Sequence, residues 1–519
     1  MKKLFTSALL VLSALTIQAK DYTGSLNIVV PDMMMNIDQD ASVSVTQQND
    51  GNYELTIEKF NFEGIPVGTI NVKNVKATVS DNGLTALQFK GNTVILDDGL
   101  NGLLVGQTVE LDLNGVLSNT GFRANIEIVA DMDGTLLPVS VKFTPDGKAA
   151  QIPNSDFENF HTATYNNYSS TEADHWHSFT SAKTTSSLYN AVRMGKQSEE
   201  STEVREGTNG KKCLKITSDV IVGKAANGTV TTGRLQAGSM FATNTANHAF
   251  LDLSNTEKDD LGDPFYTTLT TIPDAIEFWC RFKQGQDNLS NKYASMRAVI
   301  TDGTYYQDPE DKTYNNVVAV AVNKTIEGTD VWQKVTTNFD YATYASNKVE
   351  PKAILVTIST NSQPGVASTD KNSHDYIYID DLSLIYNANI ESLSVKGTEV
   401  KDEDGDRVYT TSASGNISLD DIVVTSDGKG AYITKSLEST DNGVKVNIEV
   451  LSNDLKIANS YVLYINGATT GIKAPQTVTL PNGVNAIYNL AGQQVGSMTP
   501  GQVYIVKTTD GQTKKVIKK

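Results

Sequence analysis

Cysteine is scarce in this chain of 519 residues, and basic residues are fewer than acidic ones. The two cysteines, Cys213 and Cys280, allow at most one disulfide. Alternation places Cys213 on a lysine-bearing surface face and Cys280 on a phenylalanine-bearing core face, which argues against a bridge. Lys and Arg number 43 against 60 Asp and Glu, for a net charge of −17. Such an acidic chain lacks the basic field needed to bind nucleic acid.

Long hydrophobic runs are absent except at the N-terminus, "MKKLFTSALLVLSALTIQA". Two lysines, a short apolar run and Ala19 indicate a secretory signal peptide over residues 1–19, because the run is too short to span a bilayer. No other stretch is long and apolar enough to span a bilayer, and no cysteine follows Ala19 to carry a lipid anchor. We expect an exported protein that does not span a membrane.

Catalytic motifs are also missing: there is no G-x-S-x-G elbow, phosphate loop, dinucleotide fingerprint or H-E-x-x-H. His175 and His177 flank Trp176 and could share a face for a metal, but no third ligand accompanies them at a recognisable spacing. A structural Trp176 with solvated neighbours is the favoured interpretation. Glycosidase chemistry requires two carboxylates across a cleft, which sequence alone does not locate.

Short runs rich in Val, Ile, Thr and Tyr, separated by Asn-Gly and Asp-Gly turns, predict an all-β fold. No segment keeps a helical period beyond about two turns. We expect four domains after the signal peptide: a β-barrel, a β-jelly roll, a small immunoglobulin-like β-sandwich and a C-terminal β-sandwich tail. Their ranges are 20–147, 148–388, 389–469 and 472–519.

The first domain contains about eight alternating runs, as in an up-and-down barrel. "DYTGSLNIVV" and "DGNYELTIEKFNFEG" resemble the calycin-like domains of exported Bacteroidetes proteins. The resemblance implies a small lipocalin-like barrel and names no ligand. Met33, Met34 and Met35 either line the mouth of the barrel as adaptable apolar contacts or pack on its end as a loop.

The second domain resembles a Bacteroidetes carbohydrate-metabolism domain of the carbohydrate-binding jelly-roll type. The matching segments occur in the family's order, from "IPNSDFENF" and "HWHSF" through "LGDPFYTTLTTIPDAIEFWCRFK" to "YIYIDDLSLIY". The resemblance does not extend to the loops around "TDGTYYQDPEDKTYNNVV" and after Gly365. The tail, with "IYNLAGQQV" and "PGQVYIVK", resembles C-terminal sorting domains of type IX secretion cargo, which implies export machinery as a partner.

Two adjacent aspartates, Asp380 and Asp381, interrupt the last strand of the second domain where its hydrophobic register changes. Ile377 and Ile379 are predicted on one face, and the leucines that follow on the other. Terminal Ile-Asp-Asp-Leu-x-Leu strands resemble those of carbohydrate-binding jelly rolls, where one aspartate faces the start of the domain. The metal ligands predicted for a structural Ca²⁺ site are Asp156, Glu158, Asp380 and Asp381. The alternative is that the aspartates accept backbone hydrogen bonds.

Sugars bind to flat aromatic faces together with planar polar groups. The tyrosines in or near the variable loops are the predicted ligand-binding residues: Tyr293, Tyr305, Tyr306 and Tyr314. Trp279 and Trp332 lie in strand-like runs and are predicted to be core.

The favoured hypothesis is an exported, cell-surface, non-catalytic protein that binds glycans through its jelly roll, with extracellular or periplasmic locations left open. One alternative is a glycan-active hydrolase in the same domain. Another is an apolar-ligand carrier that uses the N-terminal barrel, a function that a cavity-free barrel would exclude.

Overall fold

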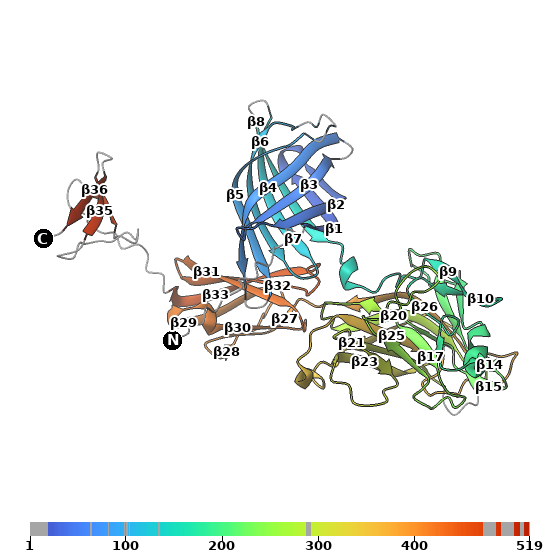
Figure 1. Cartoon of the computed structure of the whole chain (residues 1–519). Coiled ribbons are helices and arrows are strands. Elements are labelled where there is room, and N and C mark those ends of the chain that lie inside the picture. The colour runs from blue at the N-terminus through green and yellow to red at the C-terminus, as the bar shows by residue number, and fades with distance from the viewer. Residues whose placement is uncertain are drawn as a thin grey trace, which may run out of the picture. The chain divides into compact units, whose positions relative to one another are not determined.

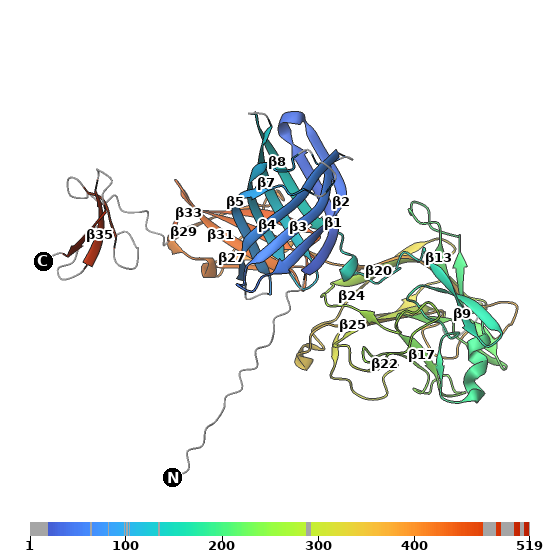
Figure 2. The ribbon, with the colours of Figure 1, turned by 45° about the horizontal axis from the view of Figure 1, so that its top comes forward.

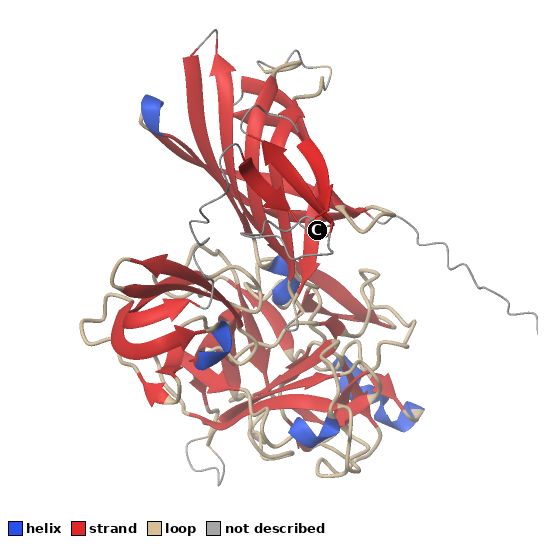
Figure 3. Ribbon diagram, turned by 90° about the vertical axis from the view of Figure 1, so that its left-hand side faces the viewer, coloured by secondary structure: helices blue, strands red, loops and turns tan. Residues whose placement is uncertain are grey.

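The computed structural model describes residues 19–62, 65–80, 83–97, 99, 102, 104–132, 135–286, 292–470, 484–488, 503–508 and 513–517. Nearly all of its regular structure is β-strand, so the predicted all-β class is confirmed (Figures 1 and 3). The predicted signal peptide lies almost entirely outside the described residues. No helix among the described residues is long and apolar enough to cross a membrane.

Residues 19–145 form a closed eight-stranded antiparallel barrel in which every strand pairs with its neighbours in the chain (Figure 2). Its strands are β1 (Ala19–Val30), β2 (Met35–Gln47), β3 (Tyr53–Phe62), β4 (Ile65–Val79), β5 (Thr85–Val94), β6 (Thr108–Leu117), β7 (Phe122–Met132) and β8 (Thr135–Pro145). The 3₁₀ turn η1 (Pro31–Met33) joins β1 to β2. The predicted up-and-down barrel is confirmed.

Alternation along each barrel strand explains the closed fold. In β1, Leu26, Ile28 and Val30 are buried while the residues between them are more exposed. A strand of this pattern directs alternate side chains into the barrel and out to solvent. At one end the rings of Tyr22 and Phe143 both lie near that of Phe122, with centroid separations of 6.0 and 5.7 Å.

The second domain packs two larger sheets around one hydrophobic core. One sheet has the order β12 (Ser198–Ser201), β13 (Cys213–Thr217), β26 (Tyr376–Ile385), β20 (Ala275–Lys283) and β24 (Gln333–Asn338). The other has the order β16 (Thr229–Thr231), β25 (Ala353–Ser359), β21 (Ala294–Thr301) and β23 (Val317–Ile326), with β19 (Thr267–Thr268) also paired to β25.

The second domain also contains a smaller sheet, two hairpins and three 3₁₀ segments. A four-stranded sheet contains β11 (Lys183–Thr184), β17 (Arg234–Ala237), β18 (His248–Leu251) and β22 (Tyr306–Asp308). Two hairpins are β9 (Phe160–Tyr165) with β10 (Tyr168–Ala173), and β14 (Asp219–Ile221) with β15 (Lys224–Ala226). The 3₁₀ segments are η2 (Lys148–Ala150), η3 (Ser187–Met194) and η4 (Ala345–Asn347).

A bulge explains the paired aspartates in β26. Asp381 has a left-handed φ of 45°, and the pairing with β20 shifts register between Glu277 and Trp279. The extra residue turns the strand over, so Ile377 and Leu382 enter the same core. The predicted change of face is therefore wrong, because a bulge restores the original face.

Residues after 388 fall partly in a second compact unit, composed of residues 392–424, 434–449 and 460–519. Its strands belong to three sheets. They are β27 (Ile390–Val395), β28 (Thr398–Glu399) and β30 (Ile422–Ser426); β29 (Val408–Ile417), β31 (Tyr432–Thr440), β32 (Gly443–Leu451) and β33 (Ala458–Thr470); and β34 (Val484–Tyr488), β35 (Val503–Thr508) and β36 (Thr513–Ile517). The short turn η5 (Leu419–Asp421) precedes β30.

Candidate functional site

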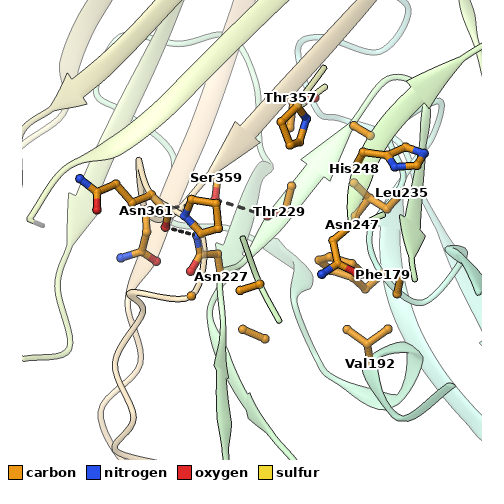
Figure 4. Close-up of a pocket in the computed structure, with 18 of the residues that line it drawn as sticks. Phe179, Val192, Asn227, Thr229, Leu235, Asn247, His248, Thr357, Ser359 and Asn361 are labelled. Atoms are coloured by element: carbon orange, nitrogen blue, oxygen red, sulfur yellow. Dashed lines mark hydrogen bonds between the residues drawn. The ribbon is translucent and has the colours of Figure 1, made fainter. Parts of the chain in front are cut away.

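A cleft of about 390 Å³ opens in the second domain among η3, β16, β17, β18, β21 and β25. Figure 4 shows its two sides. Asn227, Ser359 and Asn361 lie on one side, while Phe179 and Val192 lie on the other. The cleft therefore has a side rich in amides and hydroxyls facing a side rich in hydrocarbon.

The polar side contains one unsatisfied hydrogen-bond acceptor. Asn227 donates from Nδ2 to the carbonyl of Gln363 at 2.8 Å, while its buried Oδ1 has no partner among the described residues. The hydroxyls of Thr229 and Ser359 lie 3.3 Å apart. An unpaired buried amide oxygen costs about 1–3 kcal/mol. A ligand hydroxyl would recover this free energy once the Asn227 side chain turns its Oδ1 toward the cleft.

The apolar side is assembled by η3 and β17. Leu188, on η3, is 67% exposed at the edge of the cleft, whereas Leu235 on β17 is buried. Asn247 fixes this region because its Oδ1 accepts from the amides of Gly238 and Ser239 at 2.9 and 3.0 Å. Its amide group is thus used to hold the loop and not to bind a ligand.

His248 lines the cleft as a neutral imidazole. Its Nδ1 lies 2.8 Å from the carbonyl of Thr245, which can only accept, so Nδ1 carries the proton. Burial lowers the pKa of His248. Its Nε2 is consequently an acceptor, and the hydroxyl of Tyr305 lies 3.3 Å from it.

Asp308 is the single carboxylate among the described residues that line the cleft. It lies 3.2 Å from Nε of Arg297, which also contacts Glu310 at 3.2 Å. Burial raises the pKa of Asp308, and the charge of Arg297 opposes that shift. The pair is a compensated ion pair at the edge of the cleft.

The predicted tyrosines do not line this cleft. Tyr306 and Tyr314 are buried in a core cluster, with ring centroids 5.0 Å apart, so neither offers a ring face to a ligand. Tyr306 lies on β22 and not in a loop, and both rings turn into the core. Tyr305 is 39% exposed and packs on Phe250, and Tyr293 follows the segment 287–291, which lies outside the described residues. Contact of either ring with a ligand stays a prediction.

The predicted core position of Trp279 and Trp332 is wrong. Both are half-buried, and their rings lie under guanidinium groups. Arg205 lies 4.9 Å from the ring centroid of Trp279, and Arg281 lies 5.9 Å from that of Trp332. Cation–π contacts keep these rings on the outer face of the sheet.

Three of the four predicted carboxylates line one pocket at the junction between the start and end of the domain. Asp156, Glu158 and Asp381 line one pocket of about 460 Å³ together with Arg205. The amide of Leu382 donates to the carbonyl of Ser155 at 2.9 Å, which ties the first segment of the domain to β26.

Protein donors already compensate two of these carboxylates. Arg205 donates from Nε to Oδ2 of Asp381 at 2.8 Å, and Glu158 accepts from the amides of Lys211 and Lys212 at 2.8 and 3.0 Å. A Cβ at Gly210 would lie 2.4 Å from the carboxylate of Glu158, so a larger residue there would displace this carboxylate. These contacts match the hydrogen-bond interpretation, and a calcium ion stays a prediction.

Asp380 is separated from that pocket. It is fully buried, and its Oδ1 accepts from the amide of Asp381 at 2.9 Å. Oδ2 has no hydrogen-bond partner among the described residues. Burial, reinforced by the charge of Asp381, raises the pKa of Asp380 to about 6.

His175 and His177 have different carboxylate partners. Nδ1 of His175 lies 3.2 Å from Asp263, and Nε2 of the fully buried His177 lies 3.3 Å from Asp259. Burial alone would raise the pKa of Asp259, but hydrogen bonds from His177 and from the amide of Asp263 lower it to about 2. Across the described parts of the chain, no group of three or more His, Cys, Asp or Glu is arranged to hold a metal ion.

The barrel encloses a second candidate site, a cavity of about 360 Å³. All of the described residues that line it are hydrocarbon or thioether side chains, among them Leu111, Ile126 and Phe143. Met33 and Met35 belong to this lining. The structure thus favours the barrel-mouth interpretation of the methionines, with Met34 directed to solvent at 96% exposure.

Sequence reasoning singled out the carboxylates and left two interpretations of the methionines open, but it missed the lining of the cleft in the second domain. Phe179, Asn227 and Leu235 come from separate segments that only the fold brings together. The lining of the barrel could have been read from alternation, since the inward positions of its strands are consistently apolar.

Residues 19–146 match the family model described as a calycin-like beta-barrel domain. No curated protein matches the chain.

Two solved structures from Bacteroides share a distant likeness with part of the chain. A candidate glycoside hydrolase from Bacteroides vulgatus is 17% identical, with a TM-score of 0.30, over 44% of this chain and 96% of its own. A candidate glycoside hydrolase from Bacteroides thetaiotaomicron is 13% identical, with a TM-score of 0.30, over 71% of this chain and 98% of its own. Likeness at these scores carries no inference about function.

Proposed function

We propose that this is an exported, non-catalytic protein that binds a glycan in the cleft of its jelly-roll domain. The observation that supports this function is the two-sided cleft, in which amides and hydroxyls such as those of Asn227 and Ser359 face Phe179. A pyranose ring has the matching chemistry, with an apolar C–H face and a polar edge.

Affinity electrophoresis of the mature chain in gels that contain a panel of polysaccharides tests the proposal. Asn227→Ala removes the unpaired acceptor, and we expect at least a threefold loss of affinity for the retarding polysaccharide, because one hydrogen bond is worth about 1 kcal/mol. Thr336→Ala is the control, since the Thr336 side chain bonds Glu277 on the neighbouring strand β20, in the sheet that contributes no described residue to the cleft. Equal affinity of Asn227→Ala and the control would place binding elsewhere, and no retardation by any polysaccharide would contradict the function.

Hydrolysis in the same cleft is less well supported by its chemistry. Two carboxylates must flank the scissile bond. Among the described residues the cleft presents Asp308 alone, and that group is paired with Arg297. If the wild type releases reducing sugar from a polysaccharide and Asp308→Asn does not, the result would support the hydrolase hypothesis.

A specific observation favours a second function, the carriage of an apolar ligand in the barrel. The cavity has no polar lining among the described residues, so a ligand inside it gains from apolar burial alone. Diphenylhexatriene, a hydrocarbon dye, should fluoresce on binding. Ala130→Trp should abolish the signal, because Ala130 lines the cavity and indole would fill part of it.

Delivery to the cell surface is proposed from the tail. Its described strands β34, β35 and β36 form one three-stranded sheet, which is compatible with a small sandwich read by export machinery. Deletion of residues 472–519 should leave the protein inside the producing cell envelope while the full chain reaches the surface. Equal surface exposure of both forms would contradict this role of the tail.

A further inference from the structure

Exposed apolar side chains of the barrel gather at one end. The large hydrophobic residues exposed among the described barrel residues are Met33, Met34, Val79, Val94, Leu96 and Leu136. All of them except Val79 lie on or beside the η1 turn, the end of β5 or the start of β8. We call Met33, Met34, Val94, Leu96 and Leu136 the apolar rim.

Strand direction explains why these residues share an end. In a closed antiparallel barrel, odd-numbered strands finish where even-numbered strands begin. The hairpin pairs Val30 with Met35 and Met132 with Thr135 mark that end, and Val94 pairs with Thr108 there. Val79, at the end of β4, lies at the opposite end.

The apolar rim is continuous with the cavity. Met33 lines the cavity and is also 56% exposed, so the same side chain contacts solvent and the interior. Ile95 and Leu137, next to the rim residues Leu96 and Leu136, also line the cavity. The other end contains the packed rings of Tyr22, Phe122 and Phe143.

The acidic side chains around the rim make some apolar partners less favourable than others. Asp32 and Asp97 are exposed beside it, and Lys59 is the exposed basic residue near the end of β3. An anionic lipid headgroup would be repelled by the two carboxylates, as would a second copy of this acidic end. A zwitterionic lipid surface has no net charge to repel and offers hydrocarbon to an apolar cavity.

We propose that the apolar rim docks on a zwitterionic lipid surface, with the mouth of the cavity facing the acyl chains. The methionines suit such a contact because their flexible thioethers adapt to irregular apolar surroundings. Docking itself depends only on the rim. The further step, entry of an acyl chain into the barrel, rests on the apolar-ligand function proposed above.

Co-sedimentation of the mature chain with phosphatidylcholine vesicles tests the docking. The triple variant Met33→Ser, Met34→Ser, Leu136→Ser should lower the apparent affinity at least about tenfold, since each substitution removes apolar surface that docking would bury. Val79→Ser is the matched control, because Val79 is 74% exposed at the other end. We expect it to sediment like the wild type, and added phosphatidylglycerol to weaken binding of both.

Two results would overturn the docking proposal: a wild type that stays in the supernatant, or a triple variant that sediments as well as Val79→Ser. Light scattering without vesicles provides a further check. If the wild type is a dimer and the triple variant is a monomer, the apolar rim binds a second copy of the chain and not a lipid surface. The Ala130→Trp variant separates the two proposals. It should retain vesicle binding while losing the dye, whereas a wild type that sediments without binding dye would contradict the cavity function alone.

Discussion

Arg205 and Asp381 form an ion pair across 176 residues of sequence, with Nε 2.8 Å from Oδ2. The pair joins the loop after β12 to the bulge in β26, and the guanidinium also lies over Trp279. It places a positive charge beside two adjacent aspartates at the point where the ends of the domain meet.

Loss of Arg205 should therefore destabilise the protein. Arg205→Gln leaves Asp381 facing Asp156 and Glu158 without its cation, and we expect a loss of about 2 kcal/mol in the free energy of unfolding at pH 7. Lys73→Gln is the control, because its pair with Glu54 is long, at 3.9 Å, and exposed. Chemical denaturation measures both, and equal losses would contradict a special role for Arg205.

We propose that calcium binds in the same pocket. Because Arg205 lies there, calcium binding should be easiest to detect in a variant that lacks the guanidinium. The guanidinium now supplies the charge that an ion would supply, so calcium should raise the melting temperature of Arg205→Gln more than that of the wild type. Asp381→Asn in the same background removes a ligand and should abolish the effect. Identical melting temperatures in calcium and in chelator for both proteins would eliminate the metal.

Asp380 should make stability depend on pH. Its folded pKa of about 6 lies above its unfolded value. The folded state therefore binds the proton more tightly, and stability falls as pH rises from about 4 to about 6. Relative to Asp380→Asn, the wild type should lose about 2 kcal/mol over that range. A difference between the two proteins that stays constant with pH would show that Asp380 does not titrate there.

The barrel and the irregularity of β26 could be predicted from the sequence because both depend on local signals. Alternation along β1 defines an inward face, and the adjacent Asp380 and Asp381 mark an irregular strand. The bulge itself could not be predicted, since it depends on pairing with β20. The orientation of the aromatic rings could not be predicted for the same reason. Tyr306 and Trp279 were assigned from their neighbours in sequence, whereas tertiary contacts turn the first inward and hold the second under Arg205.

Asp259 should contribute strongly to the stability of the second domain. Its Oδ1 accepts from the amides of Leu261, Gly262 and Asp263, and its Oδ2 faces His177. Asp259→Ala would leave the buried imidazole of His177 without its carboxylate partner and would release the three amides of the exposed turn, at a cost of about 3 kcal/mol. Asp302→Ala is the control, because Asp302 makes a similar turn contact with Thr304 in an exposed loop. Comparable losses in the two variants would contradict the importance of burial.

The two cysteines should remain thiols even though the protein is predicted to be exported. Cys213, predicted at the surface, is fully buried, as is Cys280, and both are free. Strand β26 lies between β13 and β20, so the two cysteines sit about two strand spacings apart, roughly 10 Å, beyond the reach of a disulfide.

Burial also raises the pKa of each thiol to about 12, which removes the reactive thiolate. A thiol-reactive chromogenic disulfide should therefore leave the native protein unlabelled over minutes and label both cysteines once denaturant unfolds it. Cys280→Ser should lower the denatured signal by half. A denatured wild type that needs a reductant before it reacts would show that a disulfide had formed, and the strand order around β26 would then be wrong.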